Sequence, residues 1–327
     1  MAEIVFGAGT SHSPMLGMGS AAWPQWGDAR DPAMTDLVDG GGVVRTYDNL
    51  LADGPDLTDE LTPEVYGAKF DRCTAALDEL ARRIAAAALD VMIVVGDDQD
   101  EHLGVENLPP ILIYHGASIL NTAGHREGLP PMVAAVVKMY GEPEVDRHYP
   151  VDSALALALI DGLLDDGFDI ASSERLPRDR GEGHAFGFPH RRLLPDGLPI
   201  VPVLLNTYMP PAQPRARRCH QLGAAVARVV CALPSDARVG VLASGGLSHF
   251  VVAEKLDRHV LDACARGDGA ALSEIPEAAL QSGTSEIKNW IVAAGACGHL
   301  GFDVIDYVPG YRTPAGTGVG LAFATWS

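Results

Sequence analysis

Four short segments carry histidine or glutamate in surroundings that are unusual for the interior of a helix or strand. They are residues 10–14 with His12, residues 184–190 with His184, residues 245–250 with His249 and residues 284–290 with Glu286. Three of the four begin where a hydrophobic, strand-like run ends, which is where open α/β sheets assemble their active sites. Imidazole and carboxylate groups together indicate a metal site served by acid–base histidines.

The segments around His12 and His249 are suited to holding a side chain in one place. His12 follows the first predicted strand in a Ser-His-Ser-Pro turn, and Pro14 prevents both strand pairing and a helix through it. The glycines Gly245 and Gly246 before His249 let the backbone approach a ligand closely. His12 could instead satisfy only its own turn, and His249 could be a partly buried histidine before a helix, with Ser248 as its N-cap.

His184 and Glu286 add acid–base and metal-binding chemistry. An imidazole with a pKa near neutrality can both take and give a proton, which suits His184 between apolar and polar neighbours. Glu286 opens a predicted helix, where the helix dipole alone would favour a carboxylate. Two histidines and a carboxylate from three loops can coordinate one face of Fe(II) and leave positions for substrate and O2. The residues by themselves therefore indicate a metal-assisted reaction.

Composition limits what these segments can belong to. The chain has 327 residues, 47% of them apolar, so it can bury a substantial core. A formal net charge of -19 argues against nucleic acid as a partner. Five widely spread cysteines without a CxxC pair argue against a disulfide framework or a thiolate zinc site. No run approaches the length of a membrane span and no signal peptide is recognisable, so we expect a cytoplasmic protein without a membrane partner.

Strand-like and helix-like patterns alternate along the chain. This alternation predicts the α/β class, with a central mixed sheet flanked by helices in a single domain. Strands are expected at residues 4–8, 91–96, 111–114, 200–205, 239–243 and 320–325. Helices are expected at residues 70–88, 131–140, 154–164, 215–233, 251–266 and 285–296.

One stretch, residues 19–63, departs from this rhythm. It is rich in Gly, Pro and Asp, and Trp23, Trp26 and Tyr47 are its isolated apolar anchors. It is too long for an ordinary connection. We therefore expect one catalytic domain over residues 1–327, with this stretch as an irregular, lid-like excursion over the site.

Several motifs, in a fixed order over nearly the whole chain, resemble the class III extradiol ring-cleavage dioxygenases. The resemblance is greatest to the protocatechuate 4,5-dioxygenase β-subunit and to the gallate and 3-O-methylgallate dioxygenases. The motifs are at residues 10–14, 184–186, 206–208, 214–219, 245–249, 286–290 and 311–318. The resemblance implies Fe(II) as cofactor, no organic cofactor, and cleavage of a protocatechuate- or gallate-like catechol with O2 to a hydroxymuconic-type product. We also expect a homo-oligomer, namely a dimer.

The resemblance also assigns roles to individual residues. It makes His12 the first iron ligand and Glu286 the carboxylate ligand. His249 matches the family's acid–base histidine, and His184 matches a second histidine near substrate and oxygen.

One position departs from the family's pattern. The family's second histidine ligand follows the strand at residues 91–96 in an Asn-Asp-His arrangement, whereas this chain has Asp97-Asp98-Gln99. Gln99 could coordinate through its amide oxygen, a weaker donor than imidazole. Alternatively His102, or less favourably Glu101, could reach the metal.

A third reading of Gln99 is that iron affinity has been lost. The chain would then be a metal-dependent hydrolase or lyase on the same scaffold, or a non-catalytic protein that keeps the pocket. The acidic residues around Gln99 could also be a solvated turn without any ligand.

An anionic aromatic substrate needs a cation despite the acidic composition. A single arginine can hold a carboxylate through two hydrogen bonds. Arg312 is the candidate, because its loop carries Gly and Pro at close spacing, although it could equally be a surface arginine.

Overall fold

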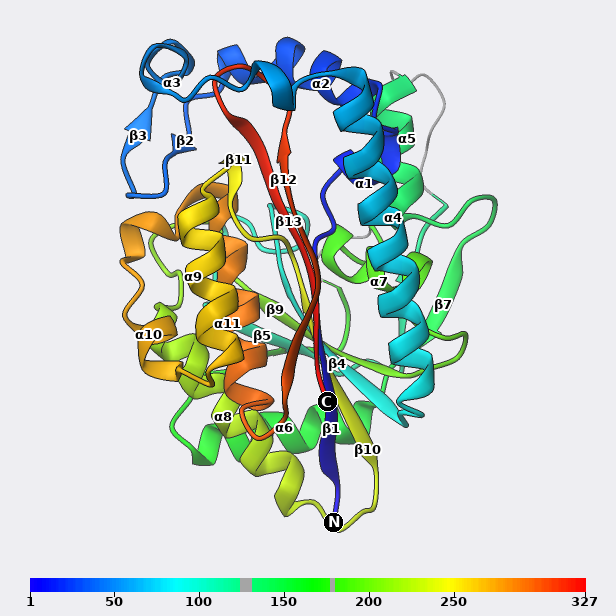
Figure 1. Cartoon of the computed structure of the whole chain (residues 1–327). Coiled ribbons are helices and arrows are strands. Elements are labelled where there is room, and N and C mark those ends of the chain that lie inside the picture. Colours follow the sequence, from blue (N-terminus) through cyan, green and yellow to red (C-terminus); the bar gives the residue numbers. More distant parts are fainter. Residues whose placement is uncertain (124–130, 177–179) are drawn as a thin grey trace.

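The computed structural model describes residues 1–123, 131–176 and 180–327, except the side chains of residues 131 and 132 (Figure 1). A mixed nine-stranded sheet forms its centre, in the order β11-β13-β1-β10-β4-β9-β5-β8, and β12 pairs with β13 outside this order. The sheet strands are β1 (Glu3–Thr10), β4 (Val91–Asp97), β5 (Ile111–Tyr114), β8 (Ala171–Ser173), β9 (Ile200–Leu205), β10 (Arg238–Ser244), β11 (His249–Val251), β12 (Phe302–Tyr311) and β13 (Thr317–Trp326). A separate two-stranded ladder pairs β6 (Ser118–Asn121) with β7 (Arg147–Pro150).

Helices cover both faces of the sheet. Figure 1 shows α8, α9 and α11 on one side and α4 and α7 on the other. The larger helices are α4 (Pro63–Ala86), α5 (Pro131–Tyr140), α6 (Ser153–Asp165), α7 (His184–Arg192), α8 (Ala216–Ala232), α9 (Glu254–Ala265) and α11 (Ile287–Ala296). Two short ones are α1 (Met15–Met18) and α10 (Gly269–Ser273). Within the described residues, no helix has both the length and the apolar character that crossing a bilayer requires.

The two hydrophobic cores follow from side-chain alternation along the central strands. In β4, Val91, Ile93 and Val95 face one core, while Met92 and Val94 face the other. Every residue of β4 and β9 is buried, as expected for strands covered on both faces. The predicted α/β class and mixed sheet are therefore confirmed.

Parallel pairing brings three strand ends to one edge of the sheet. β1, β10 and β4 run parallel, and their last paired residues are Thr10 with Ser244, and Ser244 with Gly96. The segments that follow these residues must leave the sheet side by side. The register alone thus gathers the His12 turn, the Gly245-Gly246 turn and Asp97 in one place.

The stretch at residues 19–63 lies over this same edge, at the upper end of the molecule in Figure 1. It is more regular than the sequence indicates. It contains α2 (Ala22–Arg30), η1 (Asp31–Ala33), the β2–β3 hairpin (Leu37–Val38, Val44–Arg45), α3 (Tyr47–Asp53) and η2 (Thr58–Glu60).

A buried ion pair anchors this stretch to the sheet. The guanidinium of Arg312 donates to both oxygens of Asp31, at 2.7 and 2.8 Å, and the hydroxyl of Thr317 donates to the same carboxylate. Arg312 and Asp31 are only 3% and 0% exposed. Because Arg312 and Thr317 flank the β12–β13 turn, the pair fixes the end of α2 above the strand ends.

Replacing Arg312 with Met should lower the free energy of unfolding by about 3–5 kcal/mol, because it leaves a buried carboxylate without its partner. Urea unfolding followed by circular dichroism would measure the loss. The double variant Asp31→Asn, Arg312→Met should lose less than Arg312→Met alone. If the double variant loses as much unfolding free energy as Asp31→Asn and Arg312→Met lose together as single variants, the two residues are not coupled.

Candidate metal and catalytic site

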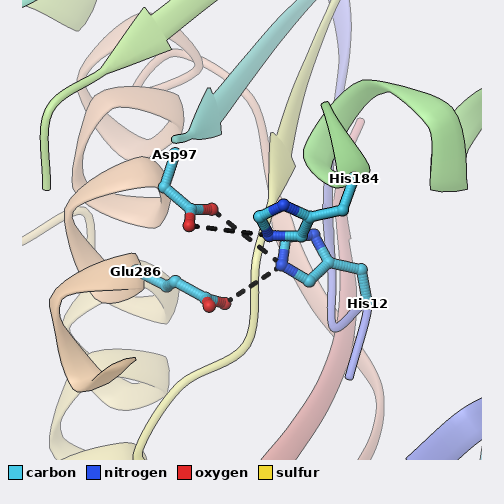
Figure 2. Close-up of side chains that lie close together, drawn as sticks. All are labelled: His12, Asp97, His184 and Glu286. Carbon is cyan, nitrogen blue, oxygen red and sulfur yellow. Dashed lines mark ion pairs between the residues drawn. The ribbon is translucent and has the colours of Figure 1, made fainter. Parts of the chain in front are cut away.

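Four side chains from four elements converge at the carboxyl edge of the sheet (Figure 2). His12 follows β1, Asp97 ends β4, His184 begins α7 and Glu286 precedes α11. One ligand atom from each lies within 4.8 Å of the others, and none of the five cysteines belongs to the group. The set offers only nitrogen and oxygen donors, which suit a divalent transition metal.

His12 presents a neutral nitrogen to this cluster. Its Nδ1 lies 3.1 Å from the hydroxyl of Ser244, which can accept a hydrogen bond and leave the lone pair on Nε2. Nε2 is 3.5 Å from Glu286 Oε2 and 3.9 Å from Asp97 Oδ1. Burial, with the nearby charge of His184, lowers the pKa of His12 to about 3. The imidazole is thus neutral, and its Nε2 lone pair is available to a cation.

Glu286 is held by the glycine turn after β10. Its Oε2 accepts from the backbone N–H of Gly246 at 2.6 Å, and its Oε1 accepts from the amide of Gln99 at 3.3 Å. Gly245 has φ +147°, and a Cβ there would lie 3.0 Å from both Asn289 Nδ2 and Glu286 Oε2. A glycine is therefore required for the turn to approach α11 this closely.

Asp97 is the second buried carboxylate. Its Oδ2 accepts a hydrogen bond from Gln99 at 3.1 Å, whereas Oδ1 has no hydrogen-bond partner among the described residues. Burial and the neighbouring Glu286 raise the pKa of Asp97. Two carboxylates are thus enclosed together, an arrangement that a cation would stabilise.

His184 carries a proton in this arrangement. Its Nδ1 lies 2.7 Å from Glu101 Oε2, and its backbone N–H donates to Glu101 Oε1 at 2.7 Å. Burial alone would lower the pKa of His184, but Glu101 and Asp97 outweigh it and raise the pKa to about 10. Its Nε2 points toward Asp97 Oδ2 at 3.7 Å. In this protonated state, Nε2 of His184 can donate a hydrogen bond to the cluster.

His249 has the opposite character. Its Nδ1 lies 3.0 Å from the carbonyl of Leu247, which accepts the ring proton and leaves the lone pair on Nε2. Nε2 lies 3.3 Å from Glu286 Oε2. Burial lowers the pKa of His249. A neutral imidazole whose free nitrogen faces the cluster can act as a general base.

The backbone of His249 is held from behind by a second buried carboxylate network. Asp257 on α9 accepts from the N–H and the hydroxyl of Ser248, at 2.8 and 2.7 Å, and from the hydroxyl of Tyr307 at 2.7 Å. The N–H of His249 donates to the hydroxyl of Thr284 at 3.0 Å. These bonds fix the loop that aims the imidazole.

A cavity of about 310 Å³ opens onto these side chains. Arg30 on α2 lies on its wall, with its guanidinium 5.6 Å from the ring centre of Trp26 and 5.1 Å from that of Phe250. Within the described part of the chain, Arg30 makes no ion pair. The lining is Arg30, His12, Ser13, Pro14, Gln99, Glu101, Val136, Tyr140, His184, His249, Phe250 and Glu286.

The structure brings most of the predicted site residues together, but not all of them. It brings His12, His184, His249 and Glu286 around one cavity, and Gln99 lies beside them with its amide nitrogen toward both carboxylates. His102 is buried on the following loop but is outside the four-residue group.

The prediction that Arg312 binds the substrate carboxylate does not match its position. Arg312 does not line the cavity, because its guanidinium is already bonded to Asp31 inside the protein. Sequence reasoning also missed Arg30 and did not single out Asp97. Arg30 had no distinguishing signal within a Gly- and Pro-rich stretch, whereas Asp97 directly follows a buried strand and could have been considered.

The chain is similar in sequence to several known proteins. Residues 60–322 match the family described as the catalytic LigB subunit of aromatic ring-opening dioxygenase. A 2,3-dihydroxyphenylpropionate/2,3-dihydroxicinnamic acid 1,2-dioxygenase from Rhodococcus sp is 32% identical over 180 residues, 55% of this chain and 50% of the relative. A gallate dioxygenase from Pseudomonas putida is 31% identical over 192 residues, 54% of this chain and 53% of the relative. The chain thus matches about half the length of these curated relatives.

Proposed function

Because the chain belongs to the family of catalytic LigB subunits of aromatic ring-opening dioxygenases, we propose that it cleaves a catechol-type ring with O2 in an Fe(II)-dependent extradiol reaction. The product would be a ring-opened, hydroxymuconic-type acid. The observation that carries the proposal is the meeting of His12, Glu286 and His249 at one 310 Å³ cavity. It combines lone-pair donors for a metal with a general base beside it.

The side chains present fit a divalent metal ion. Nε2 of His12 is buried without a hydrogen-bond partner among the described residues, although it lies 3.5 Å from Glu286 Oε2. Nitrogen and oxygen ligands bind such ions at about 2.0–2.2 Å, so neighbouring ligand atoms lie about 3 Å apart. A small inward movement of His12 and Glu286 would hold the ion. When bound, Fe(II) supplies a template for both reactants and a path for electrons between them.

The two histidines divide the proton chemistry. Nε2 of His249 takes a proton from a ring hydroxyl, since Nδ1 is held by the carbonyl of Leu247. The same nitrogen returns a proton as the ring opens. His184, kept protonated by Glu101, donates a hydrogen bond to the oxygen atoms of the reactants.

Arg30 suits a substrate that carries a carboxylate. A guanidinium on the cavity wall that makes no ion pair with a described residue can bind a carboxylate through two hydrogen bonds. The acidic ring substituent of a protocatechuate- or gallate-like compound would supply that group. Arg30 thus takes the part that sequence reasoning gave to Arg312.

Oxygen uptake tests the proposed reaction. Protein purified without O2 and supplied with Fe(II) should consume one O2 per molecule of protocatechuate or gallate and form a product with a new absorption band. A metal-dependent hydrolase or lyase would instead turn over without O2. Turnover under anaerobic conditions, or none with any catechol or gallate, would contradict the proposal.

Replacing His249 with Gln should lower kcat by about 100- to 10,000-fold, because the general base is lost. Substrate affinity, measured anaerobically, should change only a few-fold. His259→Gln is the matched control, since His259 is exposed on α9 and does not line the cavity. A kcat within a few-fold of the unmodified protein would exclude His249 as the base.

Replacing Arg30 with Met should raise KM for protocatechuate by about 10- to 100-fold, as expected for loss of a charge-assisted hydrogen bond. KM for uncharged catechol should stay within about twofold, because a Met side chain at position 30 keeps apolar contact with the rings of Trp26 and Phe250. Steady-state O2 uptake with both substrates gives the comparison. Equal losses for both would show that Arg30 does not read the carboxylate.

A further inference from the structure

Two buried atoms that face each other lack hydrogen-bond partners. They are Nε2 of His12 and Oδ1 of Asp97, and neither bonds to any described residue. The two atoms are 3.9 Å apart, which is too far for a hydrogen bond. A buried polar atom without a partner costs free energy. Two such atoms that face one another therefore indicate that a bound ion or molecule lies between them. A cation satisfies a lone pair on nitrogen and a carboxylate oxygen together.

Gln99 bonds to one oxygen of each of the two buried carboxylates. Its amide nitrogen donates to Asp97 Oδ2 at 3.1 Å and to Glu286 Oε1 at 3.3 Å. The other oxygen of each carboxylate then faces His12 Nε2, at 3.9 Å for Asp97 and 3.5 Å for Glu286. An amide nitrogen donates hydrogen bonds and has no lone pair for a metal. Gln99 therefore orients two carboxylates from outside the cluster.

The other two candidates on this loop, Glu101 and His102, do not belong to the group of four ligand atoms. Both oxygens of Glu101 bond to His184, at 2.7 Å each. His102 lies outside the group of ligand atoms, and its backbone N–H donates to Asp98 Oδ2 at 2.9 Å. Asp98 also accepts from the backbone N–H groups of residues 101 and 103, which ties this loop to itself.

We propose that Asp97 is the third protein ligand of the metal, beside His12 and Glu286, with Gln99 as a positioning residue. The inference rests on the metal dependence of the proposed function. It gives the site one imidazole and two carboxylates. Asp97 is also the last residue of β4, so its ligand oxygen is carried by a rigid strand rather than by the loop. Such an oxygen-rich set favours Fe(II) or Mn(II) over softer ions.

Four variants distinguish Asp97 from Gln99 as the ligand. Asp97→Asn removes the charge at nearly constant shape, and Gln99→Ala removes the amide bridge. The exchange variant Asp97→Asn, Gln99→His moves the ligand from position 97 to position 99. Position 99 is where the extradiol dioxygenases have a histidine ligand. Asp100→Asn controls for charge on the same loop, because Asp100 is exposed and Asn tolerates its φ of +64°.

The readouts are Mn(II) and anaerobic Fe(II) affinity by calorimetry, and the Tm with and without metal. Asp97→Asn should lower the affinity by at least about 100-fold, and Gln99→Ala by about tenfold, as for other groups that orient ligands. The exchange variant should recover to within about tenfold of the unmodified protein, and Asp100→Asn should stay within about twofold. Without metal, Asp97→Asn should melt at or above the unmodified protein, because a buried carboxylate beside Glu286 is gone.

The possible outcomes separate this inference from the proposed function. An Asp97→Asn variant that binds metal normally, or that is less stable than the unmodified protein without metal, would overturn the assignment of Asp97. If Gln99→Ala lost more affinity than Asp97→Asn, Gln99 would be the ligand. An unmodified protein that binds neither ion would overturn both proposals. Metal binding that requires Asp97, without O2 uptake on any catechol, would support the ligand and contradict the dioxygenase.

Discussion

The burial of two carboxylates beside one neutral imidazole is the constraint on which the rest of the site depends. Asp97 and Glu286 are each 1% exposed, and the same burial keeps the imidazole of His12 neutral. Taking two like charges out of water together is unfavourable unless a cation or a proton compensates them. The parallel register of β1, β10 and β4 nevertheless brings His12 and Asp97 together, and the backbone N–H of Gly246 holds Glu286 beside them. The fold therefore creates an electrostatic requirement that a divalent ion would meet.

The surrounding structure keeps the two carboxylates from relaxing. Gly245 and Gly246 allow the turn after β10 to reach Glu286, and the indole of Trp290 donates to the carbonyl of Gly245 at 2.8 Å. The Ser248–Asp257 network holds the next residue, His249, so the proposed base lies on the same turn that holds the proposed ligand Glu286. In the proposed reaction, metal binding and proton transfer would therefore be coupled through a few backbone contacts. Electrostatic preorganisation of this kind is a large part of catalysis in general.

Local pattern in the sequence was enough to predict the fold class and several of the residues that surround the cavity. Buried strands and amphipathic helices predicted the α/β class, and His12 and Glu286 adjoin such elements. Strand β12 was missed, because Asp303 and Asp306, which pair with Arg83 and Arg72 of α4, interrupt its apolar pattern. The roles of Arg30 and Arg312 depend on which one meets Asp31, and Arg312 and Asp31 are 281 residues apart in the chain. Such pairings arise only from tertiary structure, which local pattern does not encode.

In the proposed site, the enclosed carboxylates and His12 hold one transition-metal ion. Crystals soaked with Fe(II) in the absence of O2, and measured by anomalous diffraction at the iron edge, would reveal this ion. A single peak is expected within about 2.5 Å of His12 Nε2, Glu286 Oε2 and Asp97 Oδ1. No peak in the cluster, or a peak bonded by Gln99 or His102 in place of Asp97, would contradict it.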